Sequence, residues 1–418
     1  MNAPIRDMAL RAKKAAGELA AAGTGDKNRA IAAMSRLLHE EAGSIMAANR
    51  DDLKAAERAG LPDRLLKRLV FDGKKINSRI AALKEIAELP DPVGSADYCL
   101  KRPMGLHVSR VRVPIGVIAV IYESRPHVTV NVGALGMKAG NAVILRGGSE
   151  TVRTNTRLGE LWAAALEEAG LPAGAVQVVT TTDRSATFDL VREEGLVDLL
   201  VPRGGPGLVR FVRENARVPV LKHYSGICHV YIDRDADVAK AAAVVVDSKV
   251  LMPEVCNAAE TMLVHRDIAG RTLQVVGDAL RLKSVEIRGC PATREILPWA
   301  AEAADEDWTR EYLDLIINCR VVGSVEEAVD HINTYGSHHT DSIVSENYSA
   351  INYFVELVDS SVVLVNASTM FNDGGALGMG AEIGISTDRL HARGPVGMHD
   401  LTTYKYVVRG DGHTMGQP

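Results

Sequence analysis

One cysteine stands in a setting that suits a nucleophile. Cys256 lies in "VLMPEVCNAAETML" (250–263), after a proline turn and directly before the apolar-periodic run "NAAETMLV". This position predicts a strand or helix start, where amide dipoles lower a thiol pKa and raise the fraction of reactive thiolate. Packing is the alternative, because free cysteine is among the most buried residue types.

Two glycine-rich turns have the parts needed to hold a dinucleotide. "VILRGGSE" (143–150) and "LLVPRGGPGLVRFVREN" (199–215) each follow an apolar run, and the second continues into a helix pattern. Glycine allows close backbone approach to a pyrophosphate, and a helix N-terminus favours an anion. Arg146 and Arg203 could meet a 2′-phosphate, which favours NADP over NAD. No GxGxxG motif is present, so plain connecting turns are the alternative. The cofactor-binding candidates are Arg146, Gly147, Gly148, Ser149, Glu150, Gly204, Gly205 and Gly207.

The elements that must position these residues follow a strand–helix alternation. Residues 5–90 have helical spacing, and after Pro114 short Val/Ile/Leu runs alternate with helical stretches. Such runs are typical of strands buried on both faces of a parallel sheet, joined by right-handed crossovers. We predict an α/β, doubly wound fold with a boundary near residue 250. The predicted strands are 115–122, 141–147, 175–181 and 196–202, then 261–265, 317–323, 340–345 and 361–368.

Two further segments suggest an extension from the main body. Residues 98–114 alternate polar and apolar side chains around Pro103-Met104-Gly105, which predicts a hairpin. Near the C-terminus "TTYKYVVRG" is strand-like but too polar for a core strand. We expect it to pair with the sheet edge of a partner subunit.

Composition excludes several classes of protein. The chain has 418 residues, 46% of them hydrophobic, and a formal net charge of -5, with no basic stripe for nucleic acid. Its five cysteines contain no CxxC pair, which argues against a zinc site or disulfide framework and for a reducing cytosol. No uncharged apolar run approaches the ~18 residues of a membrane span. We expect a cytoplasmic protein of two or three domains, with no metal, nucleic acid or membrane partner.

At this point the sequence resembles a known family. "PEVCNAAETMLVH" is similar to the catalytic-cysteine segment of the aldehyde dehydrogenase superfamily. Within it, the chain resembles the gamma-glutamyl phosphate reductases (glutamate-5-semialdehyde dehydrogenases) over nearly its whole length. The segments that carry this resemblance are "VIYESRPHVTV", "GNAVILRGGSE", "VPRGGPGLVRFVREN", "GICHVYID", "EYLDLII" and "AEIGISTDRLHARGPVGMHDLTTYKYVVRGDG".

The resemblance implies an aldehyde dehydrogenase-like α/β fold and a reaction. L-Glutamyl 5-phosphate would be reduced with NADPH to L-glutamate 5-semialdehyde and phosphate, through a cysteine thioester, in proline biosynthesis. A homo-oligomer and a possible glutamate 5-kinase partner are also expected. The implied parts are an NADP-binding domain (1–97 and 114–250), a catalytic domain (251–390) and an oligomerisation element (98–113 and 391–418).

Individual residues carry over by their place in the matching segments. Cys256 matches the nucleophile, and Glu311 in "EYLDL" falls where the superfamily keeps a glutamate on the nicotinamide ribose. Arg146, Ser149 and Glu150 match the family's segment that contacts the adenosine part of the dinucleotide. Other members of the superfamily have an asparagine that donates a hydrogen bond to the oxyanion, and this sequence lacks it. Ser124 and Arg125 lie near the corresponding position. The substrate-side loop "VNASTMF" supplies Ser368, Thr369 and Phe371.

An absence favours reduction over oxidation. Hydrolytic relatives carry a glutamate that activates water against the thioester, whereas "KHYSGICH" (222–229) has His223 or Tyr224 in that place. The alternatives are an aldehyde dehydrogenase that oxidises a semialdehyde or acylates coenzyme A, and a non-enzymatic scaffold. Joint retention of Cys256, Glu311 and both glycine turns argues against a scaffold.

Overall fold

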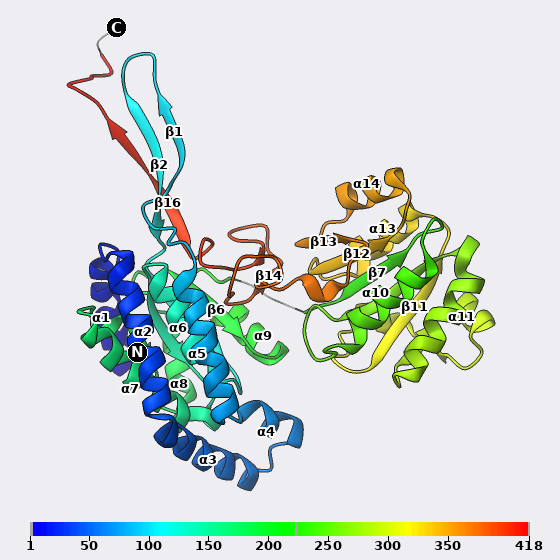
Figure 1. Cartoon of the computed structure of the whole chain (residues 1–418), viewed down its shortest axis with the longest axis horizontal. Helices are drawn as coiled ribbons and strands as arrows, with labels where there is room; N and C mark the ends of the chain where they lie inside the picture. The colour runs from blue at the N-terminus through cyan, green and yellow to red at the C-terminus, as the bar shows by residue number, and fades with distance from the viewer. Residues whose placement is uncertain (1–2, 222–224, 417–418) are drawn as a thin grey trace. The chain divides into compact units, whose positions relative to one another are not determined.

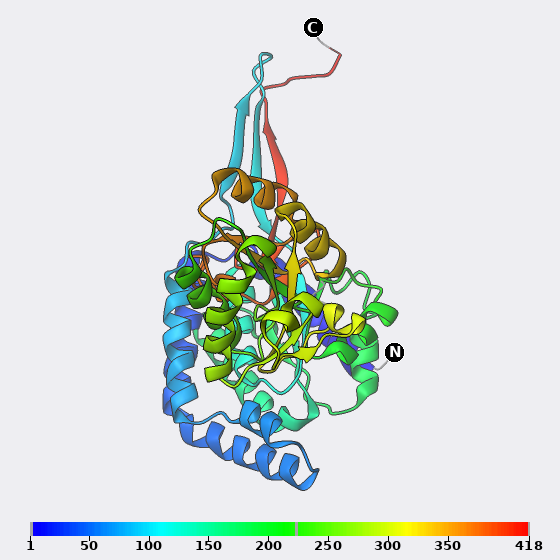
Figure 2. The same cartoon turned by 90° about the vertical axis from the view of Figure 1, so that its right-hand side faces the viewer.

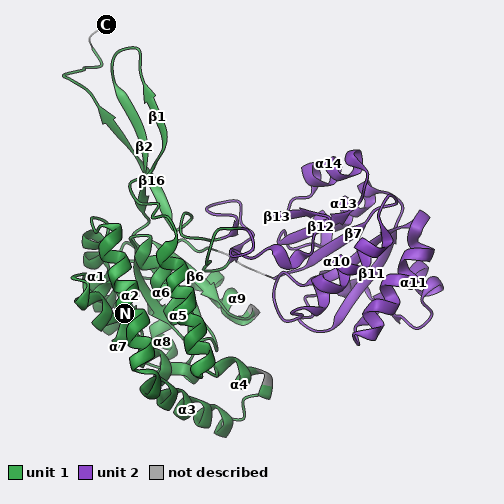
Figure 3. Cartoon of the chain, viewed as in Figure 1, with its two compact units in different colours: residues 1–222, 378–384, 396–418 green, residues 223–377, 385–395 purple. Residues whose placement is uncertain are grey.

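The chain folds into two compact units, each with its own parallel sheet. The computed structural model describes residues 3–221 and 225–416 (Figure 1). The first unit comprises 1–222, 378–384 and 396–418, and the second comprises 223–377 and 385–395 (Figure 3). The predicted α/β class is confirmed. In the described residues, no helix is long and apolar enough to cross a membrane.

The boundary between the units lies earlier than the sequence placed it. We expected it near residue 250, but the second unit begins at residue 223. The strand β7 (Cys228–Ile232) pairs with β8 (Ala259–His265) in the sheet of the second unit, and α10 (Val238–Val250) packs against β8. Residues 228–232 therefore belong to the second unit, although they lie within the range 114–250 that was expected to bind the cofactor.

The first unit is built on a four-stranded parallel sheet. Its strand order is β5-β4-β3-β6, and every residue of β3 and β4 is buried, which explains their unbroken apolar runs. The strands are β3 (Val117–Tyr122), β4 (Ala142–Arg146), β5 (Val176–Val178) and β6 (Leu199–Arg203). All four predicted strands of this set are therefore present.

Helices surround this sheet and make up most of the first unit. Residues 5–90 form five helices, as their spacing predicted, and four of them, α1, α2, α3 and α5, share one hydrophobic core with the sheet. The helices are α1 (Ala3–Leu19), α2 (Thr24–Glu40), α3 (Ala42–Arg58), α4 (Asp63–Leu69), α5 (Gly73–Glu88), α6 (His127–Lys138), α7 (Val152–Glu168), α8 (Arg184–Leu190) and α9 (Pro206–Asn215), with the 3₁₀ turns η1 (Ser149–Thr151) and η2 (Ala173–Ala175).

A three-stranded antiparallel arm extends from the first unit (Figure 2). The predicted hairpin is β1 (Ala96–Lys101) and β2 (His107–Pro114), and the C-terminal strand is β16 (Thr402–Arg409). β16 pairs with β2 of its own chain over eight residue pairs. We expected this segment to pair with the sheet edge of a partner subunit, but one of its edges pairs with β2 of the same chain. Its other edge has no strand beside it in the described chain.

The second unit contains a seven-stranded parallel sheet in the order β10-β9-β11-β8-β7-β12-β13. Its further strands are β9 (Glu286–Gly289), β10 (Ala301–Glu302), β11 (Ile316–Val322), β12 (Thr340–Val344) and β13 (Val362–Val365). Its further helices are α11 (Arg266–Leu282), α12 (Pro291–Ile296), α13 (Val325–Tyr335) and α14 (Tyr348–Leu357). Shorter elements are η3 (Asp305–Thr309), η4 (Thr369–Phe371), β14 (Ile385–Ser386) and β15 (Gly394–Pro395).

Alternate residues of these strands belong to two separate cores. Met262 packs in the cluster that includes residues of α10 and α11, whereas its neighbour Leu263 packs in the cluster of α13 and α14. This is the two-residue period of a strand covered on both faces. The loop before β8 carries Cys256 and the loop before β11 carries Glu311, so both residues lie at the amino end of this sheet.

Candidate active site

The sheet of the first unit brings its two glycine turns together. β4 and β6 are the two neighbours of β3, so the carboxyl ends of all three strands lie at one edge. Arg146–Glu150 follow β4, Ser124 and Arg125 follow β3, and the turn of Gly204, Gly205 and Gly207 follows β6. Ligands of parallel sheets bind at such an edge.

The first turn is organised around Glu150. Its Oε1 accepts hydrogen bonds from the backbone N–H and the hydroxyl of Ser124, both at 2.8 Å. Ser124 has a positive φ of 47°, which this double contact helps to hold. Arg146 is buried and donates to the carbonyl of Gly147, and burial lowers the pKa of its guanidinium. Its Nε has no hydrogen-bond partner among the described residues. A buried N–H of this kind fits a cofactor phosphate.

The second turn already holds an anion from the chain itself. Glu123 Oε2 accepts from the Gly205 N–H at 2.8 Å, at the N-terminus of α9. A Cβ built on Gly204 would lie 2.6 Å from the same oxygen. Glycine here therefore lets an anion approach the backbone, as a pyrophosphate requires.

Sequence reasoning missed a cluster of cations near the end of β3. His127 begins α6, and its pKa is lowered to about 4, first by burial and then by four neighbouring cations. These cations are Arg79, Arg125, Lys75 and Arg203. Burial also lowers the pKa values of Lys75 and Arg79 themselves. Both lie on α5, and only the packing of that helix brings them within electrostatic range of His127.

Replacement of His127 should change the response of stability to acid. Its pKa is about 4 in the folded protein against an ordinary 6.5, so its contribution is complete above pH 6.5 and is lost as the pH falls toward 4. Between pH 7 and pH 5 the loss is about 2 kcal/mol. We expect His127→Asn to remove this part of the decline, measured by urea unfolding at both values. Equal declines in the two proteins would contradict the assignment.

The second unit places Cys256 in a turn, three residues before β8 begins. The predicted strand start is confirmed, and the alternative of a helix start is wrong. The side chain is partly exposed, which suits a reactive thiol better than a core residue. A Cβ built on Gly226 would lie 1.6 Å from the carbonyl oxygen of Cys256, so two backbone segments are in direct contact there.

Asn257 joins this turn to the predicted substrate-side loop. Its Nδ2 donates to the carbonyl oxygens of Thr369, Met370 and Asn372 at 3.2–3.3 Å. Ser368 caps η4, and its hydroxyl accepts from Ser248. The structure therefore brings Ser368 and Thr369 close to the nucleophile turn. Ser368 and Thr369 are buried, whereas Phe371 is 52% exposed.

Glu311 also reaches the nucleophile turn, through Gly226. Its Oε1 accepts from the Gly226 N–H at 2.8 Å, and burial raises the pKa of its carboxyl. Two residues further along, the Leu313 N–H donates to Glu260 Oε1 at 3.2 Å. Glu260 Oε2 lies 2.8 Å from Lys249 Nζ, and both side chains are fully buried. This ion pair thereby anchors the Glu311 loop to β8.

Removal of one member of the buried pair should destabilise the fold strongly, whereas replacement of both members should destabilise it little. Burial raises the pKa of Glu260 to about 7 and lowers that of Lys249, because removal from water penalises the charged form of each group. We expect Lys249→Met to lower the free energy of unfolding by about 3–5 kcal/mol, because Glu260 is then buried without its cation and must either stay charged without compensation or take up a proton.

The matched control is the double variant Lys249→Met/Glu260→Gln, which keeps an acceptor for Leu313. It should recover most of the lost stability in the same urea titration. A single variant as stable as the unmodified protein would show that the pair is not ionised.

The candidate residues thus form two groups, one in each unit. Arg146 to Glu150, Ser124, Arg125 and the glycine turn belong to the first unit, and Cys256, Glu311, Ser368, Thr369 and Phe371 belong to the second. His223 and Tyr224 lie outside the described residues. Sequence reasoning missed Asn257 and Glu260, although both stand within four residues of Cys256; polar residues in an apolar run were the available signal.

Comparisons with known proteins agree over the whole chain. Residues 9–293 match the model of the aldehyde dehydrogenase family. The chain is 50% identical over 408 residues to the gamma-glutamyl phosphate reductase of Moorella thermoacetica, with 98% of each sequence covered. The enzyme of the same name from Thermoanaerobacter pseudethanolicus is 47% identical over 97% of this chain and 98% of its own.

A solved structure has the same fold and a similar sequence. The crystal structure of gamma-glutamyl phosphate reductase from Thermotoga maritima superposes with a TM-score of 0.96 at 45% identity. The superposition covers 98% of this chain and 99% of that one. The likeness therefore extends to both units and the arm.

Proposed function

Since this chain belongs to the gamma-glutamyl phosphate reductases of the aldehyde dehydrogenase family, we propose that it reduces L-glutamyl 5-phosphate to L-glutamate 5-semialdehyde and phosphate with NADPH. Members of this family use a nicotinamide cofactor, act in proline biosynthesis and employ a cysteine thioester. The choice of NADPH and the roles of individual residues are part of the proposal. The observation that carries it is Cys256, partly exposed in a turn that Gly226, Asn257 and Glu311 hold in place.

The sulfur of Cys256 acts as the nucleophile in this mechanism. It attacks the acyl carbon of the substrate, a carbon–sulfur bond forms, and the carbon–oxygen bond to phosphate breaks. When bound, the reduced nicotinamide supplies a hydride. The backbone N–H of Cys256 stabilises the oxyanion, and loss of one such donor typically costs ~10²–10³ in rate. Breakage of the carbon–sulfur bond then releases the aldehyde and returns the thiolate.

The cofactor has candidate residues in both units. In the first unit, Arg146 offers a buried N–H without a partner, and the Gly204-Gly205 turn lets an anion approach a helix N-terminus. These features fit the phosphates of a dinucleotide. Arg146 and Arg203 are the cations that favour a 2′-phosphate, and hence NADPH. Glu311 of the second unit is the proposed ribose ligand. Ser149 and Glu150 belong to the adenosine side in this proposal.

The substrate carries up to three negative charges, one on its α-carboxylate and two on its phosphate, which the cationic cluster can meet. The cations that act on His127 are Arg79, Arg125, Lys75 and Arg203, and we assign Arg125 with Ser124 to the phosphate or α-carboxylate. Ser368, Thr369 and Phe371 form the substrate-side loop of the second unit. A carboxylate that activates water would hydrolyse the thioester before reduction, and "KHYSGICH" contains none.

The arm is the proposed contact surface of a homo-oligomer. One face of the three strands exposes large apolar side chains, and the register aligns them: Tyr98, Leu100, Tyr404, Tyr406 and Val408. Exposed apolar patches of this kind mark contact surfaces. A reducing, cytoplasmic location is also proposed, because the mechanism needs Cys256 as a thiol. Glutamate 5-kinase is proposed as a partner because an acyl phosphate is labile and must be supplied close by.

Reverse-direction kinetics test the function against its alternatives. The enzyme should reduce NADP⁺ with glutamate 5-semialdehyde only when inorganic phosphate is present, and kcat/KM should be higher with NADP⁺ than with NAD⁺. Acid formation without phosphate would indicate an oxidising dehydrogenase, and dependence on coenzyme A an acylating one. Either result would refute the proposal.

A further inference from the structure

A second cysteine lies directly against the nucleophile turn. Cys228 is the first residue of β7 and is fully buried. Its sulfur lies 3.2 Å from the carbonyl oxygen of Cys256, within range of an S–H···O hydrogen bond. Burial, followed by the charge of Asp341, raises the pKa of its thiol well above the ordinary value. Cys228 therefore keeps its proton, and a protonated thiol is a donor and a poor nucleophile.

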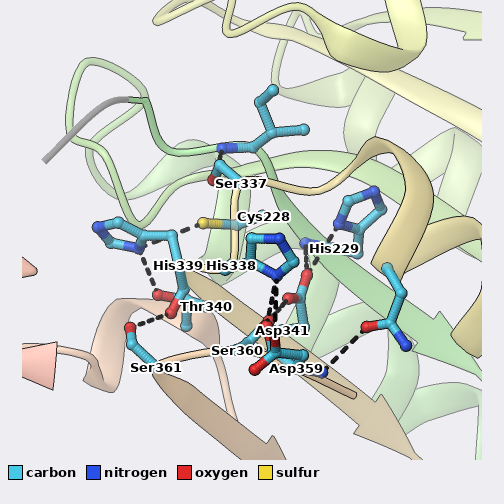
Figure 4. Close-up of polar contacts among 12 residues, drawn as sticks. Cys228, His229, Ser337, His338, His339, Thr340, Asp341, Asp359, Ser360 and Ser361 are labelled. Carbon is cyan, nitrogen blue, oxygen red and sulfur yellow. Dashed lines mark hydrogen bonds and ion pairs between the residues drawn. The ribbon is translucent and has the colours of Figure 1, made fainter. Parts of the chain in front are cut away.

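Polar contacts on the other side hold Cys228 in place. Figure 4 shows the segment Ser337–Asp341, whose side chains reach the start of β7. Ser337 Oγ accepts from the Ile227 N–H at 2.8 Å, and Asp341 Oδ1 accepts from the His229 N–H at 2.8 Å. Residues on both sides of Cys228 are thus anchored to one segment.

The sulfur is also within reach of this segment. His339 Nδ1 lies 3.6 Å from Cys228 Sγ and 2.6 Å from Thr340 Oγ1. Thr340 Oγ1 accepts from Asn372 Nδ2 at 2.6 Å, and the Asn372 carbonyl accepts from Asn257. The contacts therefore lead from the Cys256 carbonyl through Cys228 and back to the residue that follows Cys256.

The carbonyl of Cys256 has little freedom between these neighbours. Gly226 contacts it from one side so closely that no Cβ could fit, and the Cys228 thiol approaches its oxygen. The direction of this carbonyl defines the backbone conformation at Cys256, and so the direction of its side chain.

We propose that Cys228 is a positioning residue for Cys256, whose carbonyl it holds by an S–H···O hydrogen bond so that the catalytic sulfur points at the substrate. The inference rests on the proposed function in that Cys256 is taken as the nucleophile. Cys228 itself contacts no substrate and undergoes no covalent change.

A pair of variants separates hydrogen bonding from packing. Alanine and serine have nearly equal volumes, so Cys228→Ala and Cys228→Ser leave similar cavities and differ in the hydroxyl donor. We expect kcat with glutamyl phosphate to fall by about 10–100-fold in Cys228→Ala, because a misplacement near 1 Å can cost this much. Cys228→Ser should stay within about fivefold of the unmodified enzyme, and the KM for NADPH should not change in either.

Alkylation of Cys256 by iodoacetamide, followed by mass spectrometry, gives a readout that needs no substrate. The rate should change by threefold or more in Cys228→Ala and return in Cys228→Ser, about the size expected of a displaced side chain. If the unmodified enzyme fails to reduce glutamyl phosphate but this pattern holds, the proposed function is wrong and the positioning role stands. Equal effects of alanine and serine, or no effect of either, would overturn the positioning role.

Two further sets of variants guard against misfolding and general effects. If the small variants do not fold, Cys228→Thr and Cys228→Val apply the same comparison without a cavity, and threonine should be the active one. Cys319 is the control, because it is equally buried in β11 and its sulfur contacts Thr293 rather than the nucleophile turn. Cys319→Ala and Cys319→Ser should have equal kcat values.

Discussion

Cys256→Ser is expected to lower the rate of NADPH consumption with freshly generated glutamyl phosphate by at least about 10³-fold. A serine hydroxyl is hardly ionised at neutral pH and needs an adjacent base, whereas a thiol is ionised to a few per cent without help. The hydroxyl would therefore stay protonated and could not form the ester that replaces the thioester.

Binding and a second cysteine provide the controls for this experiment. NADPH binding, followed by fluorescence, should be retained in Cys256→Ser, because the first unit holds most of the proposed cofactor residues. Cys99→Ser should keep full activity, since Cys99 is exposed in β1 of the arm. Comparable turnover of Cys256→Ser and the unmodified enzyme would exclude the covalent mechanism.

Gly226→Ala is expected to be the most damaging change of a residue that does no chemistry. A Cβ at this position would lie 1.6 Å from the carbonyl oxygen of Cys256 and 2.4 Å from its carbon. Both are backbone atoms, so the turn itself must move. The Gly226 N–H would also be displaced from Glu311 Oε1, now at 2.8 Å. We expect kcat to fall by about 10²-fold or more, as a shift near 1 Å at the reacting centre can cause.

A glycine elsewhere in the second unit gives the matched control. Gly270 lies within α11, and a Cβ there meets nothing within 4 Å. Gly270→Ala should raise the free energy of unfolding by up to about 1 kcal/mol and leave kcat unchanged. If Gly226→Ala folded with undiminished kcat, close contact of the two backbones could not be important for catalysis.

Much of the first unit could be predicted because its information is local. An apolar run, a glycine turn and a helix pattern follow each other along the chain, and parallel sheets place such turns at one edge. The positions of Arg146, Gly147 and Gly204 were therefore readable in advance. Lys75 and Arg79 were not, because helix spacing alone does not say which exposed face another helix or loop will meet.

The second unit shows the opposite case. Cys256 and Glu311 precede strands and Cys228 begins one, so all three lie at the amino ends of the sheet, opposite to the edge that the usual rule for parallel sheets favours. The apolar run of β7 gave no sign of which sheet it would join. That choice depends on pairing with β8 and β12, and the boundary between the units moved with it.

The amino-acid sequence by itself determined the α/β class, the two glycine turns, the nucleophile candidate and the family, because these depend on residue types and spacings along the chain. Only the tertiary structure decided what surrounds the nucleophile. Gly226, Cys228 and Glu311 are 30, 28 and 55 residues from Cys256 in the printed sequence, yet each contributes to the same turn. Contacts between such distant segments arise from strand order and close packing, and neither has a local signature in the sequence.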